Sequence, residues 1–362
     1  MAADSERDAP QVSIIMPARN EEVSLPACLE SLQEQQQVRT EIIVVDDGST
    51  DRTRAMAESF PGVLVLDAGA LPEGWSGKCN ALMTGARAAS GRWLLLTDAD
   101  TVHLPGSLAG ALVEAESRGV DLLSYSPAQK VQGVLQSAVM PVIFAELAAH
   151  YPPQAVSDPG MPQAAANGQY LLVKRESYAA VGGHARVALT LLEDVALARN
   201  FKAAGLPIFF RYGGDRVRTR MYRTAAELRD GWTKNLALLF PDAGALATLR
   251  LAEFVLIAFS LLAATVEGAR GNYPRAIVAA SLGAVFLGLF WKRIRRAHFP
   301  LMATLLAPMG LPLFAWLLLR SRRAYRRGTV GWKGRVYGTP STVATGLVQI
   351  AGSEGSHGQI VR

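Results

Sequence analysis

Three long apolar stretches towards the end of the chain restrict what this sequence can fold into. They run from Leu246 to Val266, from Ala276 to Trp291 and from Leu301 to Leu319. About twenty consecutive, mostly apolar residues are enough for a helix to cross the hydrocarbon core of a bilayer. Half of all residues are hydrophobic, which is a high share for a soluble enzyme. We therefore expect residues 243–319 to form a membrane region.

Basic residues flank these stretches in a chain whose net charge is +6. One group follows the second stretch (Lys292, Arg293, Arg295 and Arg296), and another follows the third (Arg320, Arg322, Arg323, Arg326, Arg327, Lys333 and Arg335). Basic loops stay on the cytosolic side of a membrane, so we expect both groups to face the cytosol. Their partners are then the anionic lipids of the inner cell membrane rather than nucleic acid. The tail, residues 320–362, would be cytosolic with a disordered end.

The third stretch conflicts with this rule. Two spans return the chain to the cytosol, so a third full span would export the basic tail. Pro308 and Pro312 flank Gly310 at the centre of the stretch, and proline interrupts helical hydrogen bonding. A re-entrant or interfacial hairpin with both ends in the cytosol is therefore expected, and a straight third span is the alternative.

Short apolar and β-branched runs alternate with helical patterns over the first hundred residues. The runs are Val12–Ile15, Ile42–Val45, Val63–Leu66 and Trp93–Leu96. This alternation predicts an α/β fold with a Rossmann-like, mostly parallel sheet and helices on both faces. We expect it to occupy residues 12–242, with an interfacial helix at about 224–239. The preceding segment 1–11 is polar, is expected to be disordered and shows no secretory signal, which favours a cytosolic domain.

Acidic residues follow directly after two of the predicted strands. Asp47 comes after Ile42–Val45, whereas Asp98 and Asp100 come after Trp93–Leu96. Ligands of such sheets bind beyond the carboxyl ends of the strands, where these carboxylates would meet. Asp98 and Asp100 point the same way in an extended chain and can together hold Mg²⁺ or Mn²⁺, which would neutralise a diphosphate. An ordinary solvated turn is the alternative.

Two further segments are candidates for binding a nucleotide. Pro17, Arg19 and Glu21 stand at the end of the first strand beside the Asp47 cluster, where a nucleoside would lie. A plain strand exit followed by a capped helix is the alternative. Lys78 follows Gly77 at a helix start, where backbone N–H groups and an ammonium can meet phosphate. A surface lysine at an ordinary helix start explains that segment equally well.

Glu193 and Asp194 begin a predicted helix that ends at Gly205. The helix dipole favours a carboxylate in the first turn, which makes helix capping the simpler interpretation. The functional interpretation is that Asp194 is a general base that takes the proton of an acceptor hydroxyl group. That role requires the fold to bring Asp194 opposite the Asp98 cluster.

Taken together and in this order, four segments resemble the motifs of the inverting GT-A glycosyltransferases of family 2. They are Pro17–Glu21, Val45–Asp51, Thr97–Asp100 and Glu193–Asp194, and the resemblance covers about residues 12–239. It implies that Glu21 and Asp47 contact the nucleoside of a nucleotide sugar. Asp98 and Asp100 would then bind the metal and the diphosphate, and Asp194 would be the catalytic base.

Other segments are similar to bacterial glycosyltransferases that act on carotenoid acids and to their relatives in hopanoid pathways. These segments are Gly74–Lys78, Val181–His184, Arg220–Tyr222, Gly231–Asn235 and Gly331–Tyr337. The similarity implies a UDP-hexose donor and a polyisoprenoid lipid as acceptor. Processive members of the family carry Gln-x-x-Arg-Trp near Trp232, whereas this chain has Leu228-Arg229-Asp230-Gly231-Trp232. Transfer of a single sugar is therefore favoured over synthesis of a polymer.

Glu193, Arg220 and Trp232 are candidates for contact with the acceptor or the diphosphate. For Trp232 the alternative is a packing anchor or an aromatic belt residue on the interfacial helix. For Arg220, as for Arg218 and Arg223, the alternative is contact with lipid headgroups. His184 follows a Gly-Gly turn and is expected to be structural.

Other protein classes fit the pattern less well. A membrane scaffold that binds a nucleotide sugar without transferring it would not need both metal carboxylates and a base. Nucleotidyl transfer favours a glycine-rich basic loop after the first strand, where Pro17-Ala18-Arg19-Asn20 stands instead. Dinucleotide and P-loop enzymes need glycine patterns that do not follow a strand here. Cys28 and Cys79 lack metal or disulfide spacing and are expected to be reduced thiols.

Overall fold

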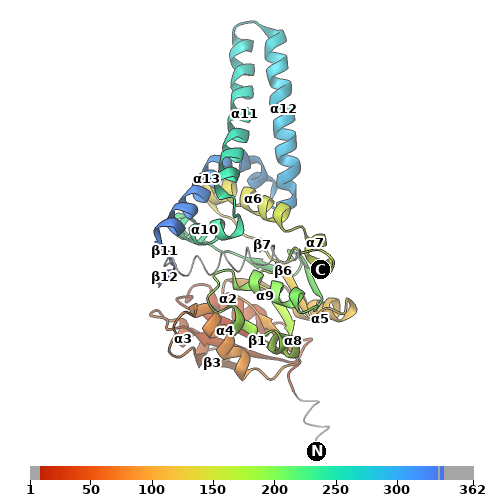
Figure 1. Cartoon of the computed structure of the whole chain (residues 1–362), viewed down its shortest axis with the longest axis vertical. Helices are drawn as coiled ribbons and strands as arrows, with labels where there is room; N and C mark the ends of the chain where they lie inside the picture. Colours follow the sequence, from red (N-terminus) through yellow and green to blue (C-terminus); the bar gives the residue numbers. More distant parts are fainter. Residues whose placement is uncertain (1–8, 333–334, 338–362) are drawn as a thin grey trace, which may run out of the picture. The chain divides into compact units, whose positions relative to one another are not determined.

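The computed structural model describes residues 9–332 and 335–337, with side chains described as far as residue 331. The chain divides into two compact units, an α/β unit and a helical unit (Figure 1). The α/β unit combines Met1–Lys130 with Tyr151–Met221, and the helical unit combines Val131–His150 with Tyr222–Arg362. The internal segment 131–150 thus groups with the later helices and not with the sheet that precedes it.

A seven-stranded sheet forms the centre of the α/β unit, in the order β3-β2-β1-β4-β8-β6-β9. The strands are β1 (Val12–Ala18), β2 (Thr40–Asp46), β3 (Val63–Asp67), β4 (Trp93–Leu96), β6 (Leu122–Ser126), β8 (Leu171–Lys174) and β9 (Ile208–Tyr212). β1 pairs in parallel with β2 and β4, β2 with β3, and β6 with β9, whereas β8 is antiparallel to both of its neighbours. The mostly parallel sheet predicted from the sequence is confirmed.

The helices of this unit cover both faces of the sheet. They are α2 (Leu25–Gln33), α3 (Thr53–Glu58), α4 (Gly77–Ala88), α5 (Ser107–Ser117), α7 (Pro153–Ser157), α8 (Arg175–Ala180) and α9 (Glu193–Ala203), with a 3₁₀ turn, η1 (Gly183–Val187). Neighbouring residues of β1 enter different cores, because side chains alternate along a strand. Ile14 packs with α2 and α5, and Ile15 packs with α4 and α9. Burial on both faces explains why the strands read as continuous apolar runs.

Close packing of α4 against the sheet depends on a glycine. A Cβ atom at Gly85 would lie 2.4 Å from Cγ2 of Ile15 and 3.1 Å from Cγ2 of Val45. The missing side chain lets the helix lie directly on β1 and β2. The start of α4, which carries Lys78, is therefore held at a fixed depth against the sheet.

A smaller sheet joins β5 (Thr101–His103), β10 (Val217–Thr219) and β7 (Ala128–Gln129). β10 is antiparallel to β5 and parallel to β7. The Thr219 hydroxyl donates to the carbonyl oxygen of Asp100 at 3.2 Å and accepts from Nε2 of Gln169 at 3.1 Å. This sheet fixes the backbone immediately after β4, where the two predicted metal ligands stand.

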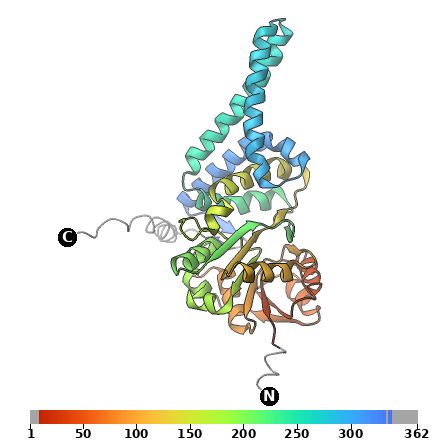
Figure 2. The same cartoon turned by 90° about the vertical axis from the view of Figure 1, so that its right-hand side faces the viewer.

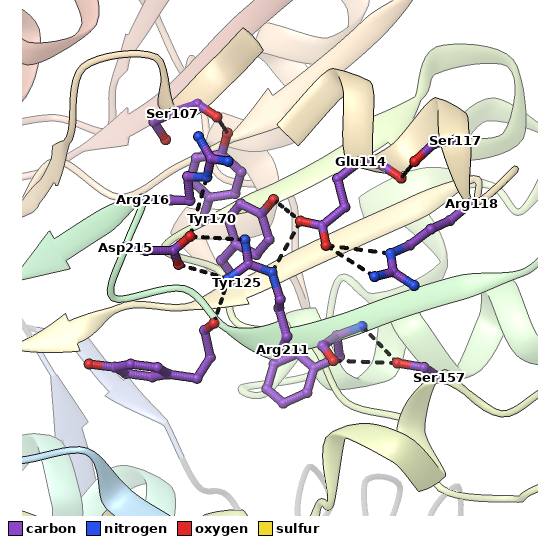
Figure 3. Close-up of polar contacts among 12 residues, drawn as sticks. Ser107, Glu114, Ser117, Arg118, Tyr125, Ser157, Tyr170, Arg211, Asp215 and Arg216 are labelled. Atoms are coloured by element: carbon purple, nitrogen blue, oxygen red, sulfur yellow. Dashed lines mark hydrogen bonds and ion pairs between the residues drawn. The ribbon is translucent and has the colours of Figure 1, made fainter. Parts of the chain in front are cut away.

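A cluster of charged and aromatic side chains lies at β6 and β9 of the main sheet (Figure 3). Glu114 on α5 accepts hydrogen bonds from Oη of Tyr125 at 2.5 Å and from Nε of Arg211 at 3.1 Å. Arg211 also donates to Asp215 at 2.7 Å, and Tyr125 stacks on Tyr170. The Glu114 carboxylate is satisfied by these donors, which hold the pKa of that group below its usual value although burial acts in the opposite direction. We interpret this cluster as structural.

The helical unit consists of long helices and one short hairpin. Its elements are α6 (Gly133–His150), α10 (Ala225–Leu239), α11 (Ala243–Ala269), α12 (Tyr273–Ile294), η2 (Arg295–Ala297), α13 (Leu301–Arg327) and the antiparallel strands β11 (Val330–Trp332) and β12 (Arg335–Tyr337). α13 packs against α6, α10 and α11. α11 and α12 lie side by side as a long antiparallel hairpin, as both views show (Figures 1 and 2).

Four helices among the described residues, α6, α11, α12 and α13, are long and apolar enough to cross a membrane. They differ in what covers them. In the most apolar 18-residue stretch of each helix, 11% of the residues are buried in α11 and 17% in α12. The corresponding shares are 50% in α6 and 44% in α13. α11 and α12, where the first two spans were predicted, therefore expose apolar side chains such as Phe259, Leu262 and Val278 that lipid could cover.

Charged residues inside these helices pair with one another. Glu146 of α6 lies 3.0 Å from Nε of Arg250 and 3.2 Å from Nε of Arg293. Glu253 accepts from the same two arginines at 3.0 and 2.8 Å. All four side chains are at most 18% exposed. Arg250 and Glu253, which interrupt the first apolar stretch, are thus members of a neutral buried quartet that joins α6, α11 and α12.

The expected break at Pro308 and Pro312 is wrong. α13 continues through both prolines as one helix of 27 residues. The two lost backbone hydrogen bonds are offset by packing, because Ala307, Leu311 and Phe314 are completely buried. Gly310 allows the closest approach, since a Cβ there would lie 2.0 Å from the carbonyl oxygen of Ala138 on α6. The stretch is a continuous helix packed against α6, not a hairpin.

Candidate active site

The carboxyl ends of β1, β2 and β4 bring the predicted site residues to one edge of the sheet. Pro17 pairs in register with Val45, and Ala18 pairs with Asp46. The N–H of Asp47 then donates to the carbonyl oxygen of Ala18 at 2.8 Å, so the two chains leave the sheet together. On the other side of β1, the N–H of Thr97 donates to Ile15 at 3.1 Å.

Hydrogen bonds tie the loop after β1 to the loop after β2. The guanidinium of Arg19 donates to the carbonyl oxygens of Asp47 and Gly48. Asn20, which has φ of 53°, accepts from the N–H of Thr50 at 2.8 Å. The N–H of Glu21 donates to Oγ1 of Thr53 at 2.7 Å. Arg19, Glu21 and Asp47 thus belong to one double loop, as their positions after neighbouring parallel strands predicted.

Lys78 lies between two carboxylates. Its Nζ is 2.8 Å from Oδ1 of Asp98 and 2.8 Å from Oε1 of Glu193. Burial would lower the pKa of Lys78, but the charges of Asp98, Glu193 and Asp194 outweigh it and hold the pKa well above its ordinary value. The ammonium stays charged and joins the end of β4 to the start of α9. The sequence predicted a contact with phosphate and did not reveal this bridge.

Asp194 is fixed by two backbone donors. Oδ2 accepts from the N–H of Gly168 at 2.9 Å, and Oδ1 accepts from the N–H of Val195 at 2.8 Å. Burial and the neighbouring charge of Glu193 raise the pKa of Asp194 to about 6, against the opposing effect of Lys78. A carboxylate with this pKa is mostly ionised at neutral pH and can still take up a proton, which is what a general base requires.

Gly168 is a site residue that sequence reasoning missed. A Cβ atom there would lie 2.9 Å from Nζ of Lys78 and 3.6 Å from both Oδ2 of Asp194 and Oε1 of Glu193. The backbone of Gly168 therefore lies directly against Lys78, Glu193 and Asp194, with no room for a side chain. The available signal was the pair Asn167-Gly168 before the apolar run of β8, but such pairs also mark ordinary turns.

A second concentration of negative charge surrounds Cys28 of α2. Its thiol donates to the carbonyl oxygen of Asp98 at 3.7 Å. Burial, followed by the charges of Asp100, Asp98 and Glu21, raises the pKa of the Cys28 thiol well above its ordinary value. Asp98, Asp100 and Glu21 thus lie within electrostatic reach of one buried atom. Both cysteines are free and buried, in agreement with their expected state as reduced thiols.

The donor set at this edge fits a divalent cation that is shared with a substrate. Within residues 9–331, no group of three or more His, Cys, Asp or Glu side chains is arranged to hold a metal ion by itself. Asp98 and Asp100 supply hard carboxylate oxygens, and Mg²⁺ or Mn²⁺ is commonly held by one or two carboxylates together with substrate phosphates and water. These residues suit an ion that arrives with a diphosphate.

Three other residues singled out in the sequence have different surroundings. Arg220 is half-buried just beyond β10. His184 is buried, where Tyr178 bonds to its ring at 2.7 Å and accepts from its N–H at 3.0 Å, and burial lowers the pKa of the ring to about 4. Trp232 is 2% exposed in the helical unit, packed edge-on against Phe144 and Tyr222. These environments favour the structural interpretation of His184 and the packing interpretation of Trp232.

Comparison with known families identifies the sheet that carries this cluster. The model of the family described as glycosyl transferase family 2 matches residues 13–143, which include Asp47, Lys78, Asp98 and Asp100. Residues 13–143 thus match a family 2 glycosyltransferase domain. Among solved structures, a mannosyltransferase from Pyrobaculum calidifontis in complex with GDP-Man and Mn²⁺ matches with a TM-score of 0.50 at 20% identity. That match covers 87% of each chain and confirms the GT-A fold.

Curated relatives extend the similarity beyond the matched domain. The chain is 29% identical over 344 residues to the 4,4'-diaponeurosporenoate glycosyltransferase of Staphylococcus aureus strain MRSA252. The enzyme of the same name from strain NCTC 8325 is 28% identical. Each alignment covers 90% of this chain and 88% of the relative, so it includes much of the helical unit. The resemblance to carotenoid-acid glycosyltransferases seen in the sequence is confirmed.

Proposed function

We propose that this family 2 glycosyltransferase moves a single sugar, with inversion, from a nucleotide sugar to a polyisoprenoid lipid in the membrane. One observation carries the proposal. The half-buried ammonium of Lys78 joins Asp98 to Glu193 at 2.8 Å each, and this bridge links the proposed donor side of the site to the segment of Asp194. A single cluster therefore unites residues suited to a diphosphate with a residue suited to proton transfer.

The donor occupies the sheet edge in this proposal. Pro17, Arg19, Glu21 and Asp47 surround the nucleoside, since the double loop that they form is the exit of two neighbouring parallel strands. Asp98 and Asp100 would hold Mg²⁺ or Mn²⁺, which would supply positive charge to the diphosphate. UDP-hexose is the proposed donor, because the similarity to carotenoid-acid glycosyltransferases runs along most of the chain.

The chemical step is a direct displacement at the anomeric carbon. An acceptor oxygen forms a bond to that carbon while the bond to the diphosphate oxygen breaks, and the nucleoside diphosphate leaves with the electron pair. Asp194 receives the proton of an acceptor hydroxyl, held ready by the N–H groups of Gly168 and Val195. Lys78 offsets part of the negative charge of Glu193 and Asp98 beside it. An acceptor that is already a carboxylate has no proton to lose and needs the base less.

The helical unit and the curated relatives support the proposal that the acceptor is a membrane lipid. The relatives are named for glycosylation of diaponeurosporenoate, a carotenoid acid, and the exposed apolar surfaces of α11 and α12 suit a lipid environment. The basic residues at the ends of α12 and α13 support the proposal that the catalytic domain lies on the cytosolic side of the inner membrane. Anionic lipids are the proposed counter-charge for the exposed members of these groups, whereas Arg293 pairs with Glu146 and Glu253 instead.

Release of nucleoside diphosphate from a panel of nucleotide sugars tests this function. Detergent-solubilised protein is assayed with Mg²⁺ or Mn²⁺, with chelator, and as the Asp100→Ala variant. The proposal predicts metal-dependent release from one donor that requires a polyisoprenoid acceptor and is abolished by chelator and by Asp100→Ala. Donor binding without turnover in the presence of polyisoprenoid acids and alcohols would favour the scaffold alternative instead.

A further inference from the structure

A basic cavity of about 290 Å³ lies in the helical unit, beside the last turns of α13. α10, α13 and the segment that leads into β11 form its walls. The side chains that give it chemical character are Asp230, Thr233, Trp316, Arg320, Arg323 and Arg327. Neither the proposed reaction nor the comparisons assign a role to this cavity.

Arg320 is held in place inside the cavity. Its Nε donates to Oγ1 of Thr233 at 3.2 Å, its Nη2 lies 4.0 Å from Oδ1 of Asp230, and its guanidinium lies 5.7 Å from the ring centre of Trp316. Asp230 does not cancel the positive charge of the cavity, because Arg229 already binds it through two hydrogen bonds of 2.7 and 3.0 Å. Arg320 can therefore direct its remaining N–H groups to a ligand without a large loss of side-chain freedom.

Arg323 and Arg327 supply charge that is not neutralised. They stand four residues apart on α13 and so share one face of the helix. Both are exposed, and among the described side chains neither has a hydrogen bond or an ion pair. Three guanidinium groups that line one cavity suit an anion with several oxygen atoms, and phosphate is one of the anions whose geometry the guanidinium matches.

The position of the cavity identifies the source of the phosphate. α13 is one of the helices that are apolar enough to cross a membrane, and the cavity stands at its basic end. Trp316, one turn before Arg320, is 45% exposed, and tryptophan is enriched where a helix leaves the hydrocarbon for the headgroup region. A cavity for a soluble anion would not require an exposed aromatic ring at its apolar side.

We propose that this cavity binds the phosphate of an anionic phospholipid headgroup, with Arg320, Arg323 and Arg327 as ligands and Trp316 against the glycerol and upper acyl region. The inference rests on the membrane location that the proposed function assigns to the helical unit. It adds a discrete lipid site to what would otherwise be a diffuse attraction between a basic tail and a charged surface.

Native mass spectrometry of the full-length protein in non-ionic detergent tests the site directly. The protein is titrated with phosphatidylglycerol or with phosphatidylcholine, and the fraction with one bound lipid is measured. The pocket variant carries Arg323→Gln with Arg327→Gln. The matched control carries Arg322→Gln with Arg326→Gln, which removes the same charge from the same exposed helix end but leaves the cavity lining intact.

The proposal predicts that phosphatidylglycerol binds more tightly than phosphatidylcholine and that the pocket variant binds it about thirtyfold more weakly. Loss of the charge-assisted hydrogen bonds that two guanidinium groups make to the phosphate is worth about 2 kcal/mol, which is a thirtyfold change in affinity. The control variant should lose less than about threefold. A variant with Arg323→Lys and Arg327→Lys should bind more tightly than the Gln variant and more weakly than wild type, since it keeps the charge but loses the guanidinium geometry, and its remaining binding guards against a folding defect.

Equal losses in the pocket and control variants would overturn the inference, because they would show a diffuse electrostatic attraction only. Displacement of phosphatidylglycerol by pyrophosphate or inorganic phosphate at the same concentration would also overturn it and assign the cavity to a soluble anion. Lipid binding is read without any transferase assay. A protein that binds phosphatidylglycerol through this cavity but releases no nucleoside diphosphate would contradict the proposed reaction alone.

Discussion

Oε1 of Glu193 lies 2.8 Å from the ammonium of Lys78, and Glu193 directly precedes Asp194 in the chain. Lys78 therefore holds down the pKa of Asp194, which burial and Glu193 raise. The change Lys78→Met leaves these carboxylates without their counter-charge and should raise the pKa of Asp194 above 6. We expect the acid limb of the pH profile of kcat/KM to move to higher pH, with a loss on the order of a hundredfold at neutral pH.

Lys174→Met is the matched control for that change. Lys174 pairs with Asp121 at 2.7 Å and has a similar exposure to Lys78, but it lies in another part of the α/β unit. Its removal should leave the pH profile in place. An unchanged acid limb in Lys78→Met would show that Lys78 does not control the ionisation of Asp194.

Asp194→Asn should stabilise the folded protein at neutral pH while it impairs transfer. The pKa of Asp194 is raised from 3.8 to about 6 in the folded state, so the stabilising contribution of this group is present below pH 3.8 and is lost as the pH rises through 6. The difference corresponds to at most about 3 kcal/mol at 1.36 kcal/mol per pKa unit. Thermal unfolding of wild type and variant should diverge between about pH 4 and pH 7 and converge in acid. A constant difference across this range would exclude the raised pKa.

Gly168→Ala should lower kcat by about ten- to hundredfold, because the new Cβ would lie 2.9 Å from the Lys78 ammonium and displace the N–H that fixes Asp194. Gly160→Ala is the control, since its nearest neighbour would be 3.4 Å away and its φ is ordinary. Steady-state kinetics of the two variants provide the measurement. Equal activity of both would show that the position of the Gly168 backbone is not critical.

The buried quartet of the helical unit should matter more for stability than an exposed ion pair. Arg250→Met leaves Glu146 and Glu253 with one arginine between them, and loss of one member of a buried ion network costs about 3–5 kcal/mol. Arg270→Met removes a pair with Glu267 in which the arginine is 70% exposed, and it should cost less than about 1 kcal/mol. Thermal unfolding in detergent compares them. Similar melting temperatures for the two variants would contradict the structural role of the quartet.

The sequence predicted the parts of this structure that depend on local pattern. β1, β2 and β4 are continuous apolar runs, and the acidic residues at their ends meet because parallel strands end at the same edge. α4 begins at Gly77 and α9 at Glu193, as the sequence indicated. α6 escaped notice because Gln136, Pro141 and Glu146 interrupt its apolar pattern. Tertiary partners explain Gln136, which donates to Tyr222, and Glu146, which pairs with Arg250.

Interactions between distant segments were beyond the reach of sequence pattern. Lys78 and Glu193 are more than a hundred residues apart in the chain, and neither local sequence predicts an ion pair with the other. Pro308 and Pro312 indicated a broken helix by local rules, but packing on α6 keeps α13 continuous. Tertiary contacts determine both features: they form the ion pair of Lys78, and they keep α13 helical through two prolines.

The most direct test of the account is a comparison of wild type and Asp194→Asn with two matched acceptors, a polyisoprenoid alcohol and the corresponding acid, presented in the same detergent with the identified donor. The account predicts that the variant loses about 10²-fold or more in kcat/KM with the alcohol and much less with the acid, which is already ionised. Equal and small losses with both acceptors would contradict the assignment of Asp194 as the catalytic base.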